Sequence, residues 1–182
     1  MRVLAGALKG QRIDTPRGTT TRPTSDRVRI ACLDTLMPYL PLGPLLDVFA
    51  GAGAVGIEGL SRGAPAATFV ERDSRALAAL RANIERLGLT DRGRALRGDA
   101  PRVLADLLRR GERFAVIFLD PPYAAADVEA AVEAAAGLLA PGGVLALQHA
   151  TRTALAPTPA SLSPWKARRF GETTLTFFRA AR

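Results

Sequence analysis

The sequence predicts a single α/β domain in which a twisted, mostly parallel sheet of seven strands carries helices on both faces. Short apolar runs alternate with helical segments along most of the 182 residues, which is typical of repeated β-α units. Only Gly171 and Glu172 separate the last two apolar runs, so these strands must pair antiparallel, because a crossover needs a longer connection. A chain of this length that is 48% hydrophobic can bury one core.

The N-terminal elements are predicted to form an extension to this domain. Two short β segments, residues 2–5 and 12–14, predict a hairpin. A helix capped by Thr24, Ser25 or Asp26 is then expected to run toward Met37. The predicted division is therefore an extension, residues 1–40, and a main domain, residues 41–182.

The elements of the main domain follow from apolar runs that are bounded by glycines, prolines and capping residues. Ser74 is predicted to cap a helix that ends at Gly88, and Pro101 to open the next helix at its first turn. Further helices are expected at residues 55–62 and 127–139. The expected strands are residues 45–49, 66–71, 94–97, 114–119, 144–148, 166–170 and 173–178.

The charge of the chain favours a polyanionic partner. Lysine and arginine number 25 against 17 acidic residues, a net charge of +8, and only Lys9 and Lys166 are lysines. Arginine makes planar, bidentate contacts with phosphate and stacks on bases. Residues 1–29 alone carry seven basic and two acidic side chains, a net charge of +5, so we expect this segment to contact nucleic acid.

Several classes of protein are disfavoured by the composition. The single cysteine, Cys32, cannot form an intramolecular disulfide, and no Cys/His cluster suggests a metal site. No signal peptide is recognisable, and no apolar run approaches the roughly 18–20 residues that cross a bilayer. We expect a soluble, cytoplasmic protein without a metal or a membrane partner.

The most informative motif is Asp120-Pro121-Pro122-Tyr123, which directly follows the apolar run of residues 114–119. The run reads as a buried strand, and ligands of open α/β sheets bind at the carboxyl ends of strands. The two prolines remove two backbone donors and fix φ, which holds the carbonyls of Asp120 and Pro121 rigidly. A carboxylate, a carbonyl and an aromatic ring within four residues suit a flat target that bears an NH2 group.

A glycine-rich motif follows the first strand of the main domain. Gly51, Gly53 and Gly56 match G-x-G-x-x-G, and Glu71 lies twenty residues after Gly51. Such glycines allow a sharp turn and the close approach of a ligand to a helix N-terminus, and we expect Gly53 to serve both purposes. Because a dinucleotide-binding site has the same spacing, a small dinucleotide-dependent oxidoreductase stays an alternative.

The positions of further acidic residues favour a different cofactor. Asp47 is awkward beside a pyrophosphate but suits the amino group of a methionine moiety. Asp99, at the end of the third strand, can accept a hydrogen bond from an adenine amino group. Asp47, Glu71, Asp99 and Asp120 thus end four successive strands, and together they predict one lined crevice.

With these motifs the chain resembles the Rossmann-like S-adenosylmethionine-dependent methyltransferases. The resemblance covers most of the chain and implies S-adenosyl-L-methionine as the cofactor. It also implies that Asp120, Pro121, Pro122 and Tyr123 form the catalytic motif of an enzyme that methylates exocyclic amino nitrogens, with Tyr123 stacking on the target base. The implied cofactor-binding residues are Asp47, Phe49, Gly51, Gly53, Gly56, Glu71, Arg72, Asp99 and Ala100.

Residues 22–29, which follow the basic hairpin, are similar to the bacterial 16S ribosomal RNA guanine-N2 methyltransferases. This resemblance implies methyl transfer to the N2 amine of a guanine in small-subunit ribosomal RNA, free or within the ribosomal subunit, and we expect a monomer. Ile30 and Cys32 depart from the family pattern, which affects the detail of that helix. The arginines expected to bind RNA are Arg12, Arg17, Arg22, Arg27 and Arg29.

Other functions remain open at this point. Methyl transfer could be directed to another amino group, of another RNA base, of DNA adenine or of protein glutamine, and a non-catalytic RNA-binding protein could share the scaffold. Cys32, on a predicted helix, and Trp165 are interpreted as packing residues. His149, at the end of the fifth strand of the main domain, is interpreted as structural, with a position near the substrate as the alternative.

Overall fold

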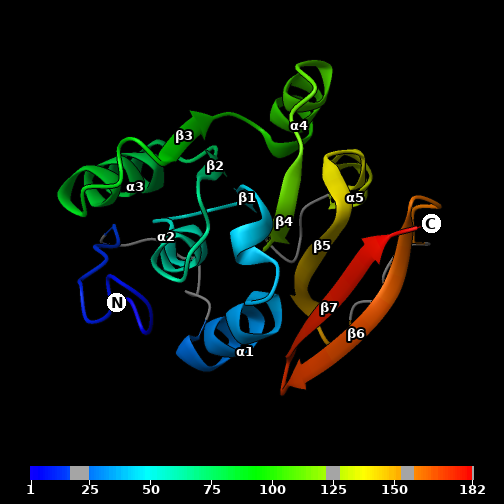
Figure 1. Ribbon diagram of the computed structural model, residues 1–182, viewed down its shortest axis with the longest axis horizontal. Coiled ribbons are helices and arrows are strands. Elements are labelled where there is room, and N and C mark those ends of the chain that lie inside the picture. The colour runs from blue at the N-terminus through cyan, green and yellow to red at the C-terminus, as the bar shows by residue number, and fades with distance from the viewer. Residues whose placement is uncertain (17–24, 122–127, 153–157, 182) are drawn as a thin grey trace.

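A computed structural model of the chain describes residues 1–16, 25–121, 128–152 and 158–181. Its seven strands are β1 (Leu45–Val48), β2 (Ala67–Glu71), β3 (Gly93–Arg97), β4 (Phe114–Leu119), β5 (Leu139–Ala150), β6 (Leu162–Phe170) and β7 (Thr173–Ala180). They form one sheet in the order β3-β2-β1-β4-β5-β7-β6 (Figure 1). Strands β1 to β5 are parallel, whereas β7 is antiparallel to β5 and β6. The predicted fold class is confirmed, including the C-terminal antiparallel pair.

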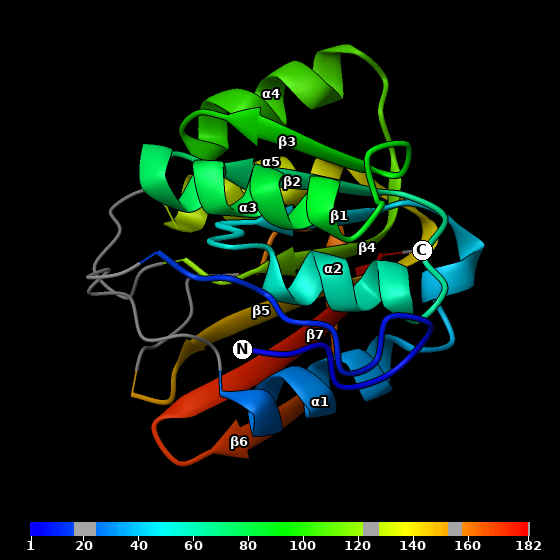
Figure 2. The same ribbon diagram turned by 90° about the vertical axis from the view of Figure 1, so that its left-hand side faces the viewer.

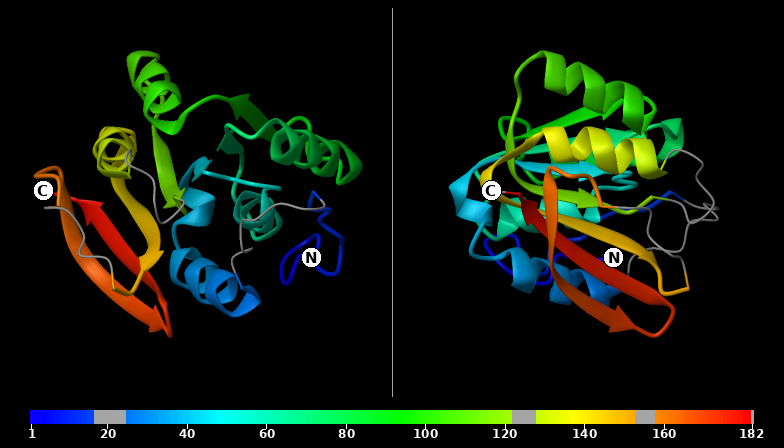
Figure 3. Two further views of the ribbon diagram at one scale, coloured as in Figure 1. Left: turned by 180° about the vertical axis from the view of Figure 1, so that it is seen from behind. Right: turned by 90° about the vertical axis from the view of Figure 1, so that its right-hand side faces the viewer.

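Helices cover both faces of the sheet, as Figures 2 and 3 show. One face packs against α1, α2 and α3, and the other against α4 and α5, so that each face has its own apolar core. Phe69 and Phe118 lie in the first core, and Ile117 and Phe114 lie in the second. The helices are α1 (Asp26–Leu36), α2 (Ala54–Ser61), α3 (Ser74–Arg86), α4 (Ala100–Arg109) and α5 (Val128–Gly137), with a short 3-10 helix at Leu40–Leu42.

The N-terminal segment is part of the compact domain. The predicted hairpin is reduced to one antiparallel bridge between Arg2 and Arg12. The buried carboxylate of Glu58, on α2, accepts hydrogen bonds from the backbone N–H groups of Leu4 and Ala5, both at 2.9 Å. Val3 and other residues of this segment lie in the core shared with α1, α2 and α3. The segment therefore could not be removed without exposing apolar surface.

Several element boundaries differ from the sequence prediction; β6, for example, begins at Leu162 and not at residue 166. Asp73, rather than Ser74, caps α3, because its carboxylate accepts a hydrogen bond from Ala76 N at 2.8 Å. Residues 141–143, which lie between the expected helix at 127–139 and the expected strand at 144–148, belong to β5, where the pairing with β4 shifts register. A Cβ on Gly143 would come within 2.9 Å of the carbonyl oxygen of Ala115, so only glycine permits this close approach of the strands.

Candidate cofactor and substrate site

The expected acidic residues lie along one edge of the sheet. Asp47 is within β1, Glu71 ends β2, Asp99 follows β3, and Asp120 follows β4. Because these strands are parallel, their carboxyl ends share one edge, and because the sheet order is β3-β2-β1-β4, the spatial order is Asp99, Glu71, Asp47, Asp120. Sequence spacing predicts that these residues lie together, and the sheet order gives their order in space.

The glycine-rich segment turns sharply between β1 and α2. Phe49 has a φ of 64°, a left-handed conformation that is strained for an aromatic residue, and Gly53 has a φ of 86°. Asp47 supports the turn, because its Oδ2 accepts a hydrogen bond from Gly56 N at 2.8 Å. The side chain of Asn83 donates to the carbonyl oxygen of Ala52 at 3.1 Å. Asn83 was missed by sequence reasoning; its only signal is a polar residue beside the apolar positions of α3.

The three glycines of the motif face different surroundings. A Cβ on Gly51 would meet no heavy atom within 4 Å, so the backbone there is open to a ligand. A Cβ on Gly53 would lie 2.4 Å from Leu80 Cδ1, and one on Gly56 would lie 2.2 Å from the ring of Phe69. Gly53 and Gly56 are thus required by packing against the core. A Cβ on Gly53 would point into the core and not toward a ligand, so the expectation that Gly53 makes room for the ligand is wrong.

Glu71 is tied to the glycine-rich turn. Its carboxylate accepts hydrogen bonds from Gly51 N at 2.7 Å and from Asp73 N at 2.8 Å, one on each oxygen. A carboxylate has about four acceptor sites, so both oxygens can also accept from a pair of vicinal hydroxyl groups. The residue therefore holds the turn in place and still has capacity for a ribose.

Asp99 occupies the N-cap position of α4, but its side chain makes no capping hydrogen bond. The carboxylate is exposed and lies 4.0 Å from the guanidinium of Arg72, which is also exposed. Ala100, the next residue, is buried. An acceptor that is not used by its own helix, beside a small buried residue, suits the edge of a bound adenine.

Burial of Asp47 changes its acidity. The side chain is 2% exposed, and desolvation raises its pKa from 3.8 to about 7, partly opposed by the hydrogen bond from Gly56 N. The nearby carboxylates of Asp120 and Glu71 also raise this pKa. Asp47 is thus close to half-ionised at neutral pH, and a cationic ligand would favour its charged form.

The motif Asp120-Pro121-Pro122-Tyr123 is described in part. Asp120 is half-buried, and its backbone N–H donates to the carbonyl oxygen of Val48 at 3.4 Å, which holds the residue against β1. Pro121 is buried. Pro122 and Tyr123 lie outside the described residues. Asp120 therefore lies next to Asp47, at the end of the row of acidic residues opposite Asp99.

One arginine expected to bind RNA is buried. Arg29 is 0% exposed, and its guanidinium donates to the carbonyl oxygen of Arg2 at 2.8 Å and to Asp26 Oδ1 at 2.9 Å. It lies 3.7 Å from the carboxylate of Glu58. The assignment of Arg29 to RNA is therefore wrong, since its charge is used to dock the N-terminal segment on α1 and α2.

The remaining RNA-binding candidates differ in their surroundings. Arg12 is exposed and forms an ion pair with Asp14 at 2.6 Å. Arg27 is exposed and lies over the ring of Phe170, 5.8 Å from its centroid. Arg17 and Arg22 lie outside the described residues. Two of the five candidates thus remain available on the described surface.

Packing and hydrogen bonds within the protein account for three residues, Cys32, His149 and Trp165. Cys32 is fully buried in the core, where desolvation raises the pKa of its thiol, so it is no nucleophile. Both ring nitrogens of His149 are engaged, one with Thr176 Oγ1 at 2.9 Å and the other with the carbonyl oxygen of Ala150 at 3.0 Å. Trp165 packs edge-on against Tyr39 and Phe177.

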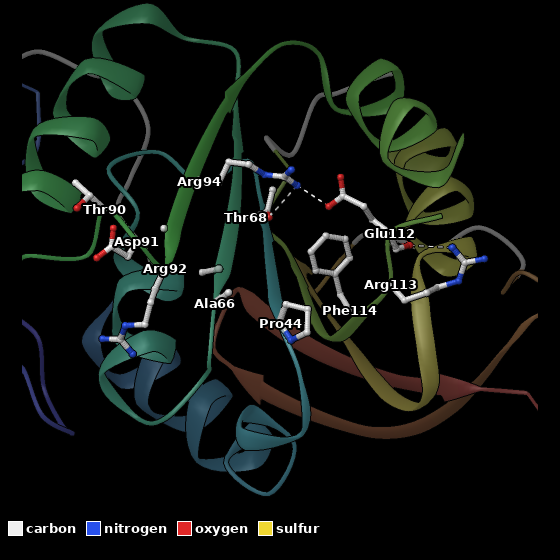
Figure 4. A pocket seen from close by; sticks show the side chains of 12 residues that line it. Pro44, Ala66, Thr68, Thr90, Asp91, Arg92, Arg94, Glu112, Arg113 and Phe114 are labelled. Atoms are coloured by element: carbon white, nitrogen blue, oxygen red, sulfur yellow. Dashed lines mark hydrogen bonds and ion pairs between the residues drawn. The ribbon is translucent and has the colours of Figure 1, made fainter. Parts of the chain in front are cut away.

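A cavity of about 380 Å³ lies at the opposite edge of the sheet, at the amino ends of the strands (Figure 4). Its wall includes Arg94, which donates to Thr68 Oγ1 at 3.3 Å and pairs with Glu112 at 2.5 Å. The charge of Arg94 is thus already balanced, and none of the expected cofactor or catalytic residues that the structure describes lines the cavity. This cavity is therefore not the candidate site for the cofactor or the substrate.

Across the four described ranges, no group of His, Cys, Asp and Glu side chains is arranged to hold a metal ion. Within the same ranges, every helix is too short or too polar to cross a membrane.

Comparison with known proteins connects this geometry to a family. The family described as Conserved hypothetical protein 95 matches residues 1–179. "Putative rRNA methyltransferase YlbH" of Bacillus subtilis is 43% identical over 123 residues, which cover 68% of this chain and 67% of that protein. "Ribosomal RNA small subunit methyltransferase D" of Haemophilus influenzae is 32% identical over 123 residues, 68% of this chain and 64% of that protein.

The similarity to solved structures extends over nearly the whole chain. The structure titled "Putative methyltransferase yhhF from Escherichia coli" superposes with a TM-score of 0.88 at 28% identity, covering 99% of this chain and 97% of that one. The chain therefore belongs to the Conserved hypothetical protein 95 family, that of the bacterial small-subunit ribosomal RNA methyltransferases.

Proposed function

We propose that this protein transfers a methyl group from S-adenosyl-L-methionine to the exocyclic N2 amine of a guanine in small-subunit ribosomal RNA. The observation that carries the proposal is the order of the four acidic residues across the sheet, Asp99, Glu71, Asp47 and Asp120. The names of the relatives support methylation of ribosomal RNA. The choice of a guanine amine rests on the resemblance of residues 22–29 and 120–123.

The order of the acidic groups along this edge of the sheet supports the proposed cofactor. Asp99 would accept from the adenine amino group, Glu71 from the ribose hydroxyls, and ionised Asp47 would face the ammonium group of the methionine moiety. The open backbone at Gly51 allows close approach between these groups. Phe49, Arg72 and Ala100 would shape the walls of the cofactor site, whereas Gly53 and Gly56 would hold the turn by packing against the core. When bound, the cofactor supplies a sulfonium methyl group as the electrophile.

Asp120 and the carbonyl of Pro121 would act on the acceptor. The lone pair of the guanine N2 atom is delocalised into the ring, which makes the amine a poor nucleophile. Two acceptors on its hydrogens would draw the nitrogen toward tetrahedral geometry and aim its lone pair along the line of displacement. The rate would come from positioning and exclusion of water. As the N–C bond forms, the S–CH3 bond breaks and S-adenosylhomocysteine leaves, and the extra proton on N2 then passes to Asp120 or to solvent. The target base must first be unstacked from the RNA.

Replacing Glu71 by alanine should weaken binding of S-adenosylmethionine by about 1–3 kcal/mol, because the charge-assisted bonds to the ribose would be lost. Isothermal titration calorimetry would measure this change. Asp73→Ala is the matched control, since it removes the cap of α3 two residues away without removing a proposed ligand contact. Equal losses of affinity in both variants would contradict the ribose assignment and indicate a general effect on α3.

Cofactor affinity should depend on pH through Asp47. With a pKa of about 7 in the free protein, the carboxyl is mostly protonated at pH 6 and mostly ionised at pH 8. If the ionised form binds the ammonium group, affinity should rise about tenfold between these pH values. Asp47→Asn should lower the affinity and abolish its pH dependence, while the Asn side-chain oxygen can still accept from Gly56 N. Calorimetry across this pH range with both proteins is the measurement.

The same linkage makes a prediction for the free protein. A native pKa above the unfolded value means that the native state holds more protons between pH 3.8 and about 7. The contribution of Asp47 to the free energy of unfolding is therefore complete below pH 3.8 and is lost as the pH rises toward about 7. Saturating S-adenosylmethionine should offset this loss, since binding would favour the ionised carboxylate. Thermal unfolding with and without the cofactor should show that stabilisation by the cofactor increases as the pH rises.

A further inference from the structure

We propose that the outer strand β6 carries a second RNA-binding surface, which leads away from the catalytic edge along the α1 face of the sheet. We call this surface the β6 track. The inference rests on the proposed function, since it assumes an RNA substrate. The track comprises four cations interleaved with two aromatic rings: Arg27, Phe170, Arg168, Lys166, Trp165 and Arg179.

The register of the sheet places these side chains on one face. Lys166 pairs with Phe177 and Arg168 pairs with Leu175, and both partners belong to the core that packs under α1. Residues opposite one another in adjacent strands point to the same side of a sheet. β6 is the outermost strand of the sheet (Figure 3). Lys166 and Arg168 are exposed on it. They therefore line the same face as α1.

Ring contacts connect the track at both ends. Arg27 and Arg168 each lie 5.8 Å from the centroid of the Phe170 ring, which joins α1 to the end of β6. At the other end, Arg179 lies 4.0 Å from the centroid of the Trp165 ring. Trp165 is 37% exposed, so part of its ring is open to a base. Cationic and aromatic groups in alternation suit single-stranded nucleic acid, where phosphates and bases alternate.

The direction of β6 connects the track to the site. Strand β5 is parallel to β4, and β7 is antiparallel to both β5 and β6, so β6 runs in the same direction as β4. The end of β6, at Phe170, therefore lies on the same edge as Asp120, and α1 begins beside it (Figure 2). RNA bound at the catalytic edge could continue along β6 without crossing the sheet.

The cations of the track are not neutralised by ion pairs among the described residues, although Arg179 donates a hydrogen bond to the hydroxyl of Tyr39 at 2.8 Å. Among the described residues, none of Arg27, Lys166, Arg168 and Arg179 forms an ion pair. The neighbouring acidic groups already have partners, as Asp26 pairs with Arg29, Asp34 with Arg62, and Glu172 with Arg152. The positive charge of the track is therefore available to phosphates.

Charges on an edge strand have another function that must be separated from RNA binding. Charged side chains at a sheet edge, glutamate as well as lysine and arginine, oppose pairing with a second sheet. Arg168→Glu therefore preserves protection of the edge but repels phosphate. Arg169→Glu is the matched control, because Arg169 is the adjacent residue, is also exposed and points to the opposite face. Both variants change the net charge by the same amount.

The test is titration of the full chain with a fluorescent small-subunit ribosomal RNA transcript. Arg168→Glu should weaken binding at least about tenfold, and Arg169→Glu less than about threefold. The neutral double variant Lys166→Gln/Arg168→Gln should lose about two phosphate contacts. Between 50 and 200 mM salt, its affinity for RNA should therefore fall about tenfold less than the affinity of the wild type falls. Thermal unfolding of each variant checks the fold.

Equal losses in Arg168→Glu and Arg169→Glu would show an effect of net charge alone and would overturn the β6 track. Unchanged binding in both would overturn it as well. Methyl transfer to the same transcript separates this result from the proposed function. Wild-type turnover with unchanged binding by Arg168→Glu would refute only the track. Binding that depends on Arg168 but yields no methylated guanine would refute only the proposed reaction.

Discussion

Replacement of Asp120 by alanine should reduce methyl transfer to ribosomal RNA by about 10²-fold or more while leaving affinity for S-adenosylmethionine nearly unchanged. The carboxylate lies at the end of the crevice beyond Asp47, where it would orient the acceptor amine and not the cofactor. Misplacing a reacting atom by about 1 Å is enough for a loss of this size. Single-turnover transfer of a radiolabelled methyl group, together with calorimetry, would measure both quantities.

Asp120→Asn is the companion variant, because its side-chain oxygen can still accept one hydrogen bond. It should retain more activity than the alanine variant. Since Asp120 raises the pKa of Asp47, both variants should be compared at a pH well above 7, where Asp47 is ionised in every protein. If Asp120→Ala lost cofactor affinity and turnover in equal measure, Asp120 would belong to the cofactor site and the proposed mechanism would be wrong.

Gly53→Val should abolish cofactor binding by distorting the glycine-rich turn. Gly53 has a φ of 86°, which a β-branched residue does not adopt without strain, and its Cβ would lie 2.4 Å from Leu80 Cδ1. Strain and overpacking together should destabilise the protein by about 2–5 kcal/mol. Chemical denaturation would measure the stability, and calorimetry the affinity.

Gly51→Ala separates packing from ligand contact. Its Cβ would meet no atom of the protein within 4 Å, so the variant should lose only about 1–2 kcal/mol through its left-handed φ of 56°. Because this direction is open, the added methyl group should reduce cofactor affinity more than it reduces stability. Wild-type affinity in Gly51→Ala would show that the cofactor does not approach the turn at this position.

Much of the fold could be predicted from the sequence because the relevant signals are local. The apolar run before Asp120 and the glycines after β1 identify a strand and a turn by composition alone. The two-residue connection before Thr173 requires an antiparallel pair, because no crossover fits into it. The acidic residues at the strand ends follow from the same local reading, which is why the candidate crevice could be predicted.

Burial and contact direction, by contrast, depend on segments that are distant in the sequence. Arg27 and Arg29 look alike in the sequence, yet one is exposed over Phe170 and the other is buried beside Glu58, because α1 turns only the second toward α2. The three glycines of the motif also look equivalent until Leu80 and Phe69 are placed beside two of them.

The sequence by itself therefore determined the class of fold, the order of its elements and the positions of the acidic residues along the chain. Only the tertiary structure decided which charges face solvent and in which order the four acids line the edge of the sheet. The physical reason is that strand order and side-chain burial are set by packing between elements, whereas hydrophobic periodicity and turn chemistry act over a few neighbouring residues.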